Sequence, residues 1–394
     1  MPKMTVRDID VAHRQVFLRV DFNVPIDAAG KITEDVRIRE ALPTIRYLIE
    51  HKAKVVIGTH LGRPKGVDEK LRMGVVGQRL SQILGQPVTV TRDCIGPEVE
   101  KAVSAMNDGE VLLLENLRFY AQEEKNDDAF AKALSRLADL YVNDAFGTMH
   151  RAHASIVAIT RYLPSTVGLL AQKEIEIMGK LLTSPAHPFA TIIGGAKISD
   201  KVAMLENIMG KIDYLLIGGG LAATFLKAAS REVGKSLIED DMLSTAARLM
   251  DNAKKRKIEL LLPEDAVVAD EIKASARTSI VTVDKILPDV RIVDIGPKTA
   301  IRFAQTLSKC NTVFWNGPMG IFEIPEFAGG TKIIGQKLAS LKATTVTGGG
   351  STAEAVIKLG LADKFSFVST GGGAALEFLS GLTLPGVAAI PDKK

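Results

Sequence analysis

Apolar strands that run directly into glycine pairs or triplets are the feature that most constrains the fold of this 394-residue chain. Four segments of the second half share it: Thr191-Ile-Ile-Gly-Gly195, Leu215-Leu-Ile-Gly-Gly-Gly220, Val346-Thr-Gly-Gly-Gly350 and Phe367-Val-Ser-Thr-Gly-Gly-Gly373. Where a helix follows such a turn, free N–H groups and the helix dipole favour an anion, and glycine lets a phosphate come close. One such turn is equally consistent with tight strand-to-helix packing. Four of them favour a nucleotide-binding half.

Short runs of Val, Ile and Leu alternate with segments of helical period, which is typical of parallel strands joined by crossover helices. We expect an α/β protein, and the length suits two domains. Strands are predicted at 16–20, 54–58, 111–114, 140–142, 190–193, 214–217, 260–262, 312–315, 344–347 and 365–369. Helices are predicted at 37–53, 98–106 and 128–138. The segment Ser165–Leu182 has a long helical period and is either an interdomain helix or an ordinary crossover helix.

Composition excludes several classes of protein. The formal charge of +4 is mild, and we find no basic block that marks a nucleic-acid or membrane partner. Two cysteines cannot form a disulfide framework and have no metal-ligand spacing. The N-terminus has no apolar signal region, and no apolar run approaches the ~20 residues of a membrane span. We therefore expect a cytoplasmic protein.

Basic side chains follow the predicted strands of the first half. Because the carboxyl ends of parallel strands share one edge of a sheet, these side chains should meet where ligands bind. Arginine grips carboxylates and phosphates with two hydrogen bonds, so the set predicts an anionic ligand. It comprises Arg19, Arg37, Arg63, Arg118 and Arg151. Three histidines near these positions have no metal-like partners and are expected to form hydrogen bonds or to bind an anion, not to hold a metal: His60, His150 and His153.

The strand ends of the second half carry glycine and lysine instead, which suits a polyphosphate and a flat base. Neither a GxxxxGK[ST] loop nor the motifs of protein kinases are present. Gly218-x-Gly220-x-x-Ala223, with Glu239-Asp240 about 20 residues on, fits the loose dinucleotide fingerprint, so a nicotinamide oxidoreductase is the alternative. Five arginines around a substrate fit that chemistry poorly. Direct phosphoryl transfer, which depends on positioning and charge neutralisation, fits better.

Seven longer strings extend this interpretation: RVDFNVP (19–25), THLGRP (59–64), ENLRFY (115–120), NDAFGTMHRAH (143–153), IGGAKISDK (193–201), FWNGPMGIFE (314–323) and STGGGA (369–374). In order and across nearly the whole chain, they resemble phosphoglycerate kinase. The resemblance implies two doubly wound parallel-sheet domains joined by a helical hinge. Residues 1–164 with about 376–394 would bind 3-phosphoglycerate, 165–184 would form the hinge helix, and 185–375 would bind nucleotide. It also implies a monomer that transfers a phosphoryl group reversibly between 1,3-bisphosphoglycerate and ADP, giving 3-phosphoglycerate and ATP.

The resemblance also implies roles for individual residues. Those expected to bind phosphoglycerate are Arg19, Asp21, Phe22, Asn23, Arg37, His60, Leu61, Gly62, Arg63, Arg118 and Arg151. Those expected to bind the nucleotide are Gly195, Lys197, Lys201, Gly218, Gly219, Asn316, Pro318, Glu323, Gly349, Gly350, Ser351 and Thr352, with Gly371–Gly373 beside the phosphates. Four residues are expected at the transferring phosphoryl group: Arg37, Lys197, Gly349 and Gly372.

Ser351 departs from the family pattern. Where the family's GGGD turn has an aspartate for the nucleotide's Mg²⁺, this chain has serine, a weaker and neutral ligand. We expect Mg²⁺ to be required, held by Ser351 or Thr352 directly or through water, or by Glu354 one turn along the helix. The same departure allows a second class of protein, a two-domain binding or regulatory protein that has lost catalysis.

Overall fold

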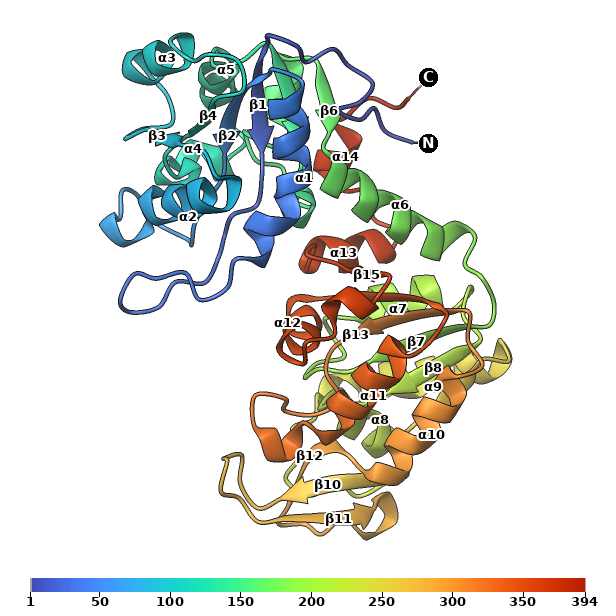
Figure 1. The fold of residues 1–394 in the computed structure, drawn as a ribbon. Helices are drawn as coiled ribbons and strands as arrows, with labels where there is room; N and C mark the ends of the chain where they lie inside the picture. The colour runs from blue at the N-terminus through green and yellow to red at the C-terminus, as the bar shows by residue number, and fades with distance from the viewer. Residues whose placement is uncertain (1, 394) are drawn as a thin grey trace. The chain divides into compact units, whose positions relative to one another are not determined.

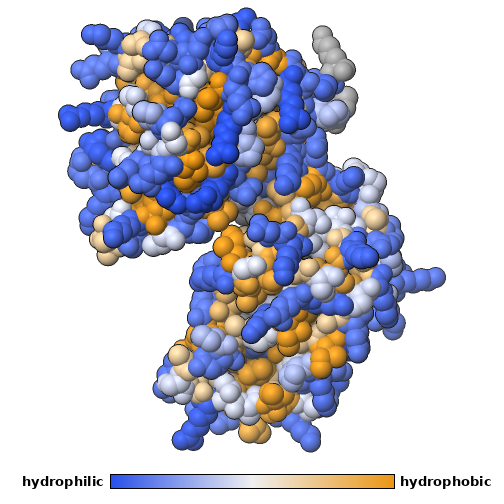
Figure 2. Space-filling view, viewed as in Figure 1, coloured by the Kyte–Doolittle hydropathy of each residue, from blue (hydrophilic) through white to orange (hydrophobic). Residues whose placement is uncertain are grey.

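The computed structural model describes residues 2–393 and divides the chain into two compact units (Figure 1). The first comprises Met1–Glu176 and Thr383–Lys394, and the second comprises Ile177–Leu382. On the visible surface of each unit, hydrophilic residues predominate and apolar residues are interspersed among them (Figure 2). Within residues 2–393, no helix combines the length and apolar character needed to cross a bilayer.

The first unit is built on a six-stranded parallel sheet with strand order β3-β4-β2-β1-β5-β6. Its strands are β1 (Gln15–Arg19), β2 (Lys54–Gly58), β3 (Val88–Val90), β4 (Val111–Leu113), β5 (Leu140–Asn143) and β6 (Ser165–Val167). Its helices are α1 (Val36–Glu50), α2 (Gly74–Leu84), α3 (Pro97–Ser104), α4 (Ala121–Glu124), α5 (Asp128–Ser135) and α14 (Pro385–Ala388). The central strands are almost wholly buried because Val, Ile and Leu face helices on both sides.

The second unit repeats this plan, with strand order β15-β14-β13-β7-β8-β9, again all parallel. Its strands are β7 (Phe189–Ile193), β8 (Tyr214–Ile217), β9 (Glu259–Leu261), β13 (Thr312–Asn316), β14 (Thr344–Gly348) and β15 (Phe367–Val368). Its helices are α7 (Val202–Ile208), α8 (Leu221–Ala228), α9 (Leu243–Lys255), α10 (Pro297–Leu307), α11 (Gly329–Ala339), α12 (Gly350–Lys358) and α13 (Gly373–Leu379). The predicted fold class of two doubly wound parallel sheets is confirmed.

The strand predictions miss five strands: β3 and β6 at the two edges of the first parallel sheet, and the three strands of a separate antiparallel sheet. An antiparallel sheet with order β11-β10-β12 consists of β10 (Asp265–Ala269), β11 (Thr278–Thr282) and β12 (Arg291–Ile295). Edge strand β11 is polar and mostly exposed, so no apolar run marks it. Strand β3 is also half-exposed. Both are edge strands, which need less apolar sequence than strands covered on two faces.

Helix α6 (Leu169–Thr183) carries the chain from one unit into the other, and the unit boundary after Glu176 lies inside it. The helix begins later than the predicted residue 165, because Ser165–Val167 pair with β5 as strand β6. Asp144, directly after β5, accepts a hydrogen bond from the Ala171 N–H at 3.0 Å and so caps the start of α6. A side chain on Gly168 would come within 2.3 Å of this carboxylate, which explains the glycine.

Asp144 gives a test of this cap through pH. Burial raises its pKa to about 6, against about 3.9 in an unfolded chain. The folded protein therefore holds this proton more tightly, and stability falls as pH rises from about 4 to about 6. Asp144→Asn cannot ionise. We therefore expect its free energy of unfolding, relative to that of the wild type, to rise by on the order of 2 kcal/mol between pH 4.5 and 7.5. Denaturant unfolding at both pH values measures the change. An equal wild-type-to-variant difference at both pH values would contradict the assignment.

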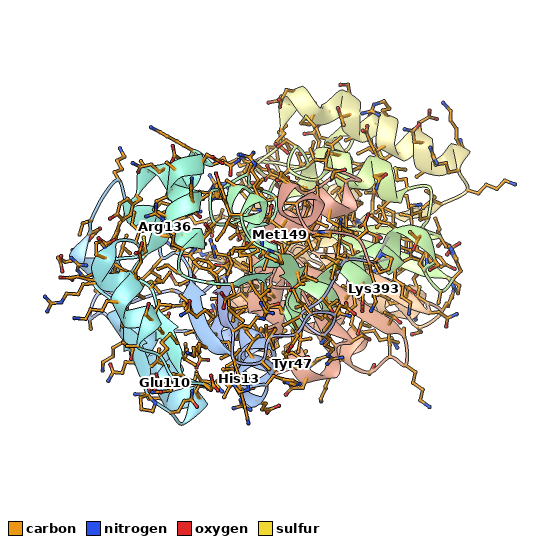
Figure 3. The ribbon with its side chains drawn as sticks, turned by 90° about the horizontal axis from the view of Figure 1, so that it is seen from above. His13, Tyr47, Glu110, Arg136, Met149 and Lys393 are labelled. Atoms are coloured by element: carbon orange, nitrogen blue, oxygen red, sulfur yellow. The ribbon has the colours of Figure 1, made fainter. Side chains whose placement is uncertain are left out.

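The last residues of the chain return to the first unit. The Gly386 N–H donates to the Met149 carbonyl, and Met4 N–H donates to the Pro391 carbonyl. Lys393 pairs with Asp8 at 2.5 Å, and Figure 3 labels both Met149 and Lys393. Helix α13, just before this return, belongs to the second unit, where Asn207 Nδ2 donates to the Leu379 carbonyl at 2.8 Å.

Candidate active site

The loops after β1, β2 and β4 are joined by hydrogen bonds at the carboxyl edge of the first sheet. Asn116 is central: its Oδ1 accepts from the N–H groups of Leu61 and Arg118, and its Nδ2 donates to the Leu61 carbonyl. Asn23 Oδ1 accepts the Gly62 N–H at 2.8 Å, and Thr59 Oγ1 accepts the Phe22 N–H at 2.9 Å. The structure thus brings together the predicted phosphoglycerate residues of these loops. Asn116 belongs to the ENLRFY string (115–120), but the sequence predicts no role for it.

Asp21, Arg37 and His60 form the charged centre of this edge. Arg37 Nη1 donates to Asp21 Oδ2, and Arg37 is half-buried near the start of α1. Burial opposes the charge of Asp21, but the positive charges of Arg37 above all and of Arg19 hold the pKa of the carboxyl below its ordinary value. Burial and the positive charges of Arg19, Arg118 and Arg37 hold the pKa of His60 well below its ordinary value, against the effect of Asp21. His60 is therefore neutral at pH 7.

The other predicted phosphoglycerate residues differ in how far solvent reaches them. Arg63 is exposed, Arg151 is half-buried with its Nε 3.1 Å from His150 Nε2, and Arg118 donates from Nη1 to the Gly62 carbonyl. Phe22 and Leu61 are buried, so their backbone groups face the loops while their side chains lie in the core. A ligand at this edge would meet mainly arginine, asparagine and main-chain groups.

Arg19 lies behind the edge rather than on it. It is the last residue of β1 and has no exposed surface. Its Nε donates to Ser155 Oγ at 2.8 Å, its Nη1 donates to the Val20 carbonyl, and its Nη2 lies 3.5 Å from His60 Nδ1. Arg19 is among the residues predicted to bind phosphoglycerate, and in the structure its guanidinium group is buried next to His60.

Several glycines of the second unit are required by backbone packing. A Cβ on Gly194 would lie 2.2 Å from the Pro318 carbonyl oxygen, and one on Gly219 would lie 2.4 Å from the Gly195 nitrogen. The N–H groups of Gly195, Gly218 and Gly219 donate to the carbonyls of Pro318, Ile193 and Met319 respectively. These three predicted nucleotide residues therefore have their N–H groups engaged within the protein.

A buried polar chain supports the start of α12. Lys201 Nζ donates to Asn316 Oδ1 at 2.6 Å, and Asn316 Nδ2 donates to the Gly348 carbonyl at 2.6 Å. The Thr352 hydroxyl accepts from the Gly317 N–H and donates to the same Gly348 carbonyl. Burial lowers the pKa of the Lys201 ammonium. Asn316 and Thr352 thus hold the turn in place from inside.

Several of the residues predicted to bind the nucleotide remain accessible to solvent. Gly350 and Ser351 are exposed in the first turn of α12, and no atom lies within 4 Å of a Cβ added to Gly350 or Gly372. Lys197 and Glu323 are also exposed, while Pro318 is buried. Since the first N–H groups of a helix have no partner within it, the start of α12 is suited to a phosphate.

The side chains near the start of α12 offer few oxygen ligands for a magnesium ion. Among residues 2–393, no group of three or more His, Cys, Asp or Glu side chains could hold a metal ion. The Thr352 hydroxyl is buried with both partners inside the protein, and Glu354 pairs with Lys358 at 2.7 Å. Ser351 is exposed and places a hydroxyl group at the turn. This arrangement suits an ion carried mainly by nucleotide phosphates and water.

Two other features have acidic side chains that are engaged within the protein. Glu239, the acidic residue of the dinucleotide alternative, accepts hydrogen bonds from the Ile198 N–H and the Ser199 hydroxyl, and so closes a turn instead. A cavity of about 720 Å³ lies where β3 and β4 begin, at the opposite edge of the first sheet, near Glu110 and His13 (Figure 3). Asp108 and Glu110 in its lining already pair with His13 and Asn107.

Comparison with known proteins decides the family. A family model described as phosphoglycerate kinase matches residues 6–382. The chain belongs to the phosphoglycerate kinase family. The resemblance inferred from the seven strings is thereby confirmed.

Individual relatives agree along the whole chain. Phosphoglycerate kinases of Dictyoglomus turgidum and Moorella thermoacetica are 55% and 50% identical, with 100% of each chain covered. The solved structure of phosphoglycerate kinase from Coxiella burnetii is 37% identical, with a TM-score of 0.87 over 98% of both chains. The structure of phosphoglycerate kinase from Pyrococcus horikoshii has the same TM-score and coverage at 34% identity.

Proposed function

We propose that this protein is a phosphoglycerate kinase, which transfers a phosphoryl group reversibly between 1,3-bisphosphoglycerate and ADP. Family membership over residues 6–382 carries the proposal. The arginine-rich edge of the first unit suits a ligand with a carboxylate and a phosphate. The start of α12 in the second unit suits the phosphates of a nucleotide.

In the direction of acyl phosphate synthesis, a carboxylate oxygen of 3-phosphoglycerate attacks the γ-phosphorus of ATP. The new O–P bond forms as the bond to the β,γ-bridging oxygen breaks, and ADP leaves. No covalent enzyme intermediate is required. Arg37 and Lys197 stabilise the charge on the phosphoryl oxygens, and the N–H groups at Gly349–Thr352 hold the nucleotide phosphates. Asp21 orients Arg37 through their hydrogen bond.

Transfer requires the carboxylate and the γ-phosphate to meet away from water, which would hydrolyse the acyl phosphate. We therefore infer that the two units close about helix α6 during turnover, as the hinge prediction requires. A cytoplasmic location and a monomeric state also stay predictions. A coupled assay with ATP and 3-phosphoglycerate tests the activity. Turnover that needs both substrates is expected, whereas tight nucleotide binding without turnover would favour the binding-protein alternative.

Mg²⁺, which would neutralise charge on the nucleotide phosphates, is expected to be held by the Ser351 hydroxyl directly or through water. Ser351→Asp adds a carboxylate at this position, so we expect the ADP-bound protein to bind Mg²⁺ about tenfold more tightly, the ratio that about 1.4 kcal/mol produces. Calorimetric titration of Mg²⁺ into the ADP complex measures the affinity independently of turnover. Ser351→Asn is the neutral control of equal size.

Glu354→Ala distinguishes the remaining alternative. Because Glu354 pairs with Lys358 and is about half exposed, we expect its removal to leave the Mg²⁺ affinity unchanged. A loss of Mg²⁺ affinity in Glu354→Ala, together with no gain in Ser351→Asp, would show that Glu354 is the ligand.

A further inference from the structure

A series of buried hydrogen bonds lies behind the charged centre of the first unit, and two of its members, Glu123 and Ser155, have no part in the function proposed so far. Glu123, with no exposed surface, accepts the Ser155 N–H at 2.9 Å and the Ser155 hydroxyl at 2.5 Å. Ser155 Oγ in turn accepts from Arg19 Nε at 2.8 Å. Arg19 Nη2 then reaches His60 Nδ1 at 3.5 Å. These hydrogen bonds therefore connect Glu123 to His60, a residue of the proposed phosphoglycerate site.

The donor and acceptor roles along this series are fixed by chemistry. Ser155 has one hydroxyl hydrogen, and the short contact with Glu123 takes it, so a lone pair of Oγ faces Arg19. A guanidinium only donates, so His60 Nδ1 must accept. His60 is neutral and has one ring proton, which therefore lies on Nε2.

No neighbouring carboxylate is placed to hold the ring proton on Nδ1 instead. Asp21 Oδ1 is 3.9 Å from His60 Nδ1, beyond hydrogen-bond distance. The groups whose charges act on His60 are Asp21, Arg19, Arg118 and Arg37. At the far end, His153 Nδ1 lies 3.8 Å from Glu123 Oε1, and burial together with the nearby arginines lowers the pKa of His153 to about 3, so it is neutral as well.

We propose that Glu123 and Ser155 are positioning residues that act through Arg19 to hold His60 as the Nε2–H tautomer. The meaning of this for binding rests on the proposed function: an N–H donor suits the carboxylate and phosphate oxygens of 3-phosphoglycerate, whereas a bare ring nitrogen would repel them. A neutral histidine among arginines thus adds a directed hydrogen bond without further positive charge.

Nitrogen NMR of the protein labelled with ¹⁵N-histidine tests the tautomer directly. The chain has six histidines, and the signals of His60 are assigned by their loss in His60→Gln. We expect wild-type His60 to be neutral and protonated on Nε2 from pH 6 to 8. In Ser155→Ala and Glu123→Gln we expect signals of both tautomers, because Arg19 is no longer held toward Nδ1.

Turnover supplies the second readout. Loss of one oriented hydrogen bond is expected to raise KM for 3-phosphoglycerate about 3- to 10-fold, while KM for ATP changes less than about twofold. Ser155→Thr keeps the hydroxyl and should restore the wild-type tautomer and KM. Tyr141→Phe is the matched control, because it removes a buried hydrogen bond of 2.7 Å to the Ser155 carbonyl and none of the hydrogen bonds of Arg19.

Each contrary outcome has a defined meaning. A wild-type His60 that is protonated on Nδ1, or charged at pH 7, overturns the proposal without any variant. So does a folded Ser155→Ala protein whose tautomer and KM match wild type, or whose KM values change as in Tyr141→Phe. If wild-type protein shows the Nε2–H tautomer but does not turn over 3-phosphoglycerate, the proposed function fails and the role of Glu123 and Ser155 in fixing the tautomer stands.

Discussion

Replacing Arg37 with alanine is expected to lower kcat by about three orders of magnitude. Arginines that stabilise charge in phosphoryl transfer contribute about this much or more. Arg37 suits the role because it lies at the start of α1, is partly exposed and is oriented by the partly buried Asp21. Arg37→Lys keeps the charge but loses the two-pronged geometry, so we expect it to recover only a small part of the rate.

Arg39→Ala is the matched control for this experiment. Arg39 lies on the same helix, has a half-exposed side chain and pairs with Asp35, a partly buried carboxylate that Arg79 also binds. Arg39→Ala removes one of these two partners and none of the residues of the proposed site, so kcat should stay within about twofold of wild type. If Arg37→Ala raised KM for 3-phosphoglycerate with kcat unchanged, Arg37 would contribute uniform binding and not stabilisation of the transition state.

Gly317→Ala is expected to lose stability, whereas Gly350→Ala is expected to stay folded and to lose affinity for ATP. Gly317 has a φ of 89°, and a Cβ there would lie 2.3 Å from the backbone of Gly194. The backbone would have to move, so we expect the second unit to lose more than about 3 kcal/mol of stability. Gly350 begins α12 with no atom within 4 Å of an added Cβ, so Gly350→Ala should fold normally.

The methyl group of Gly350→Ala instead occupies the space that a phosphate would need. We expect KM for ATP to rise about tenfold with the thermal midpoint within about 2 °C of wild type, values typical of a lost phosphate contact and a neutral helix substitution. Thermal unfolding and initial rates on both variants measure these effects. A stable Gly317→Ala protein, or a Gly350→Ala protein with normal KM for ATP, would show that the two glycines have been assigned the wrong roles.

The sequence predicted the two parallel sheets because strands covered on both faces need continuous apolar runs. It could not predict β11, whose exposed Thr and Ser residues depend on pairing with β10 for their conformation. The start of α6 was misplaced for a related reason. Ser165–Val167 fit a helical period, but their pairing with β5 is a contact that local sequence does not contain.

For the candidate site residues, the sequence alone could not distinguish residues of the same type that the fold places in different surroundings. Arg19 and Arg63 both follow from strand ends, but only the fold shows that Arg19 is buried and Arg63 exposed. Gly219 and Gly350 both belong to glycine triplets, but one is packed against backbone and the other is open. Glu123 and Ser155 are 32 residues apart, and no sequence signal joins them.

The most direct test of the account is to detect the acyl phosphate itself. Purified protein is mixed with ATP, Mg²⁺ and 3-phosphoglycerate in the presence of hydroxylamine, which converts an acyl phosphate into a stable hydroxamate. We predict one hydroxamate for each ADP formed, only when ATP and 3-phosphoglycerate are both present, and almost none with Arg37→Ala. A folded protein that binds ADP but forms no hydroxamate at any Mg²⁺ concentration would contradict the proposed phosphoryl transfer.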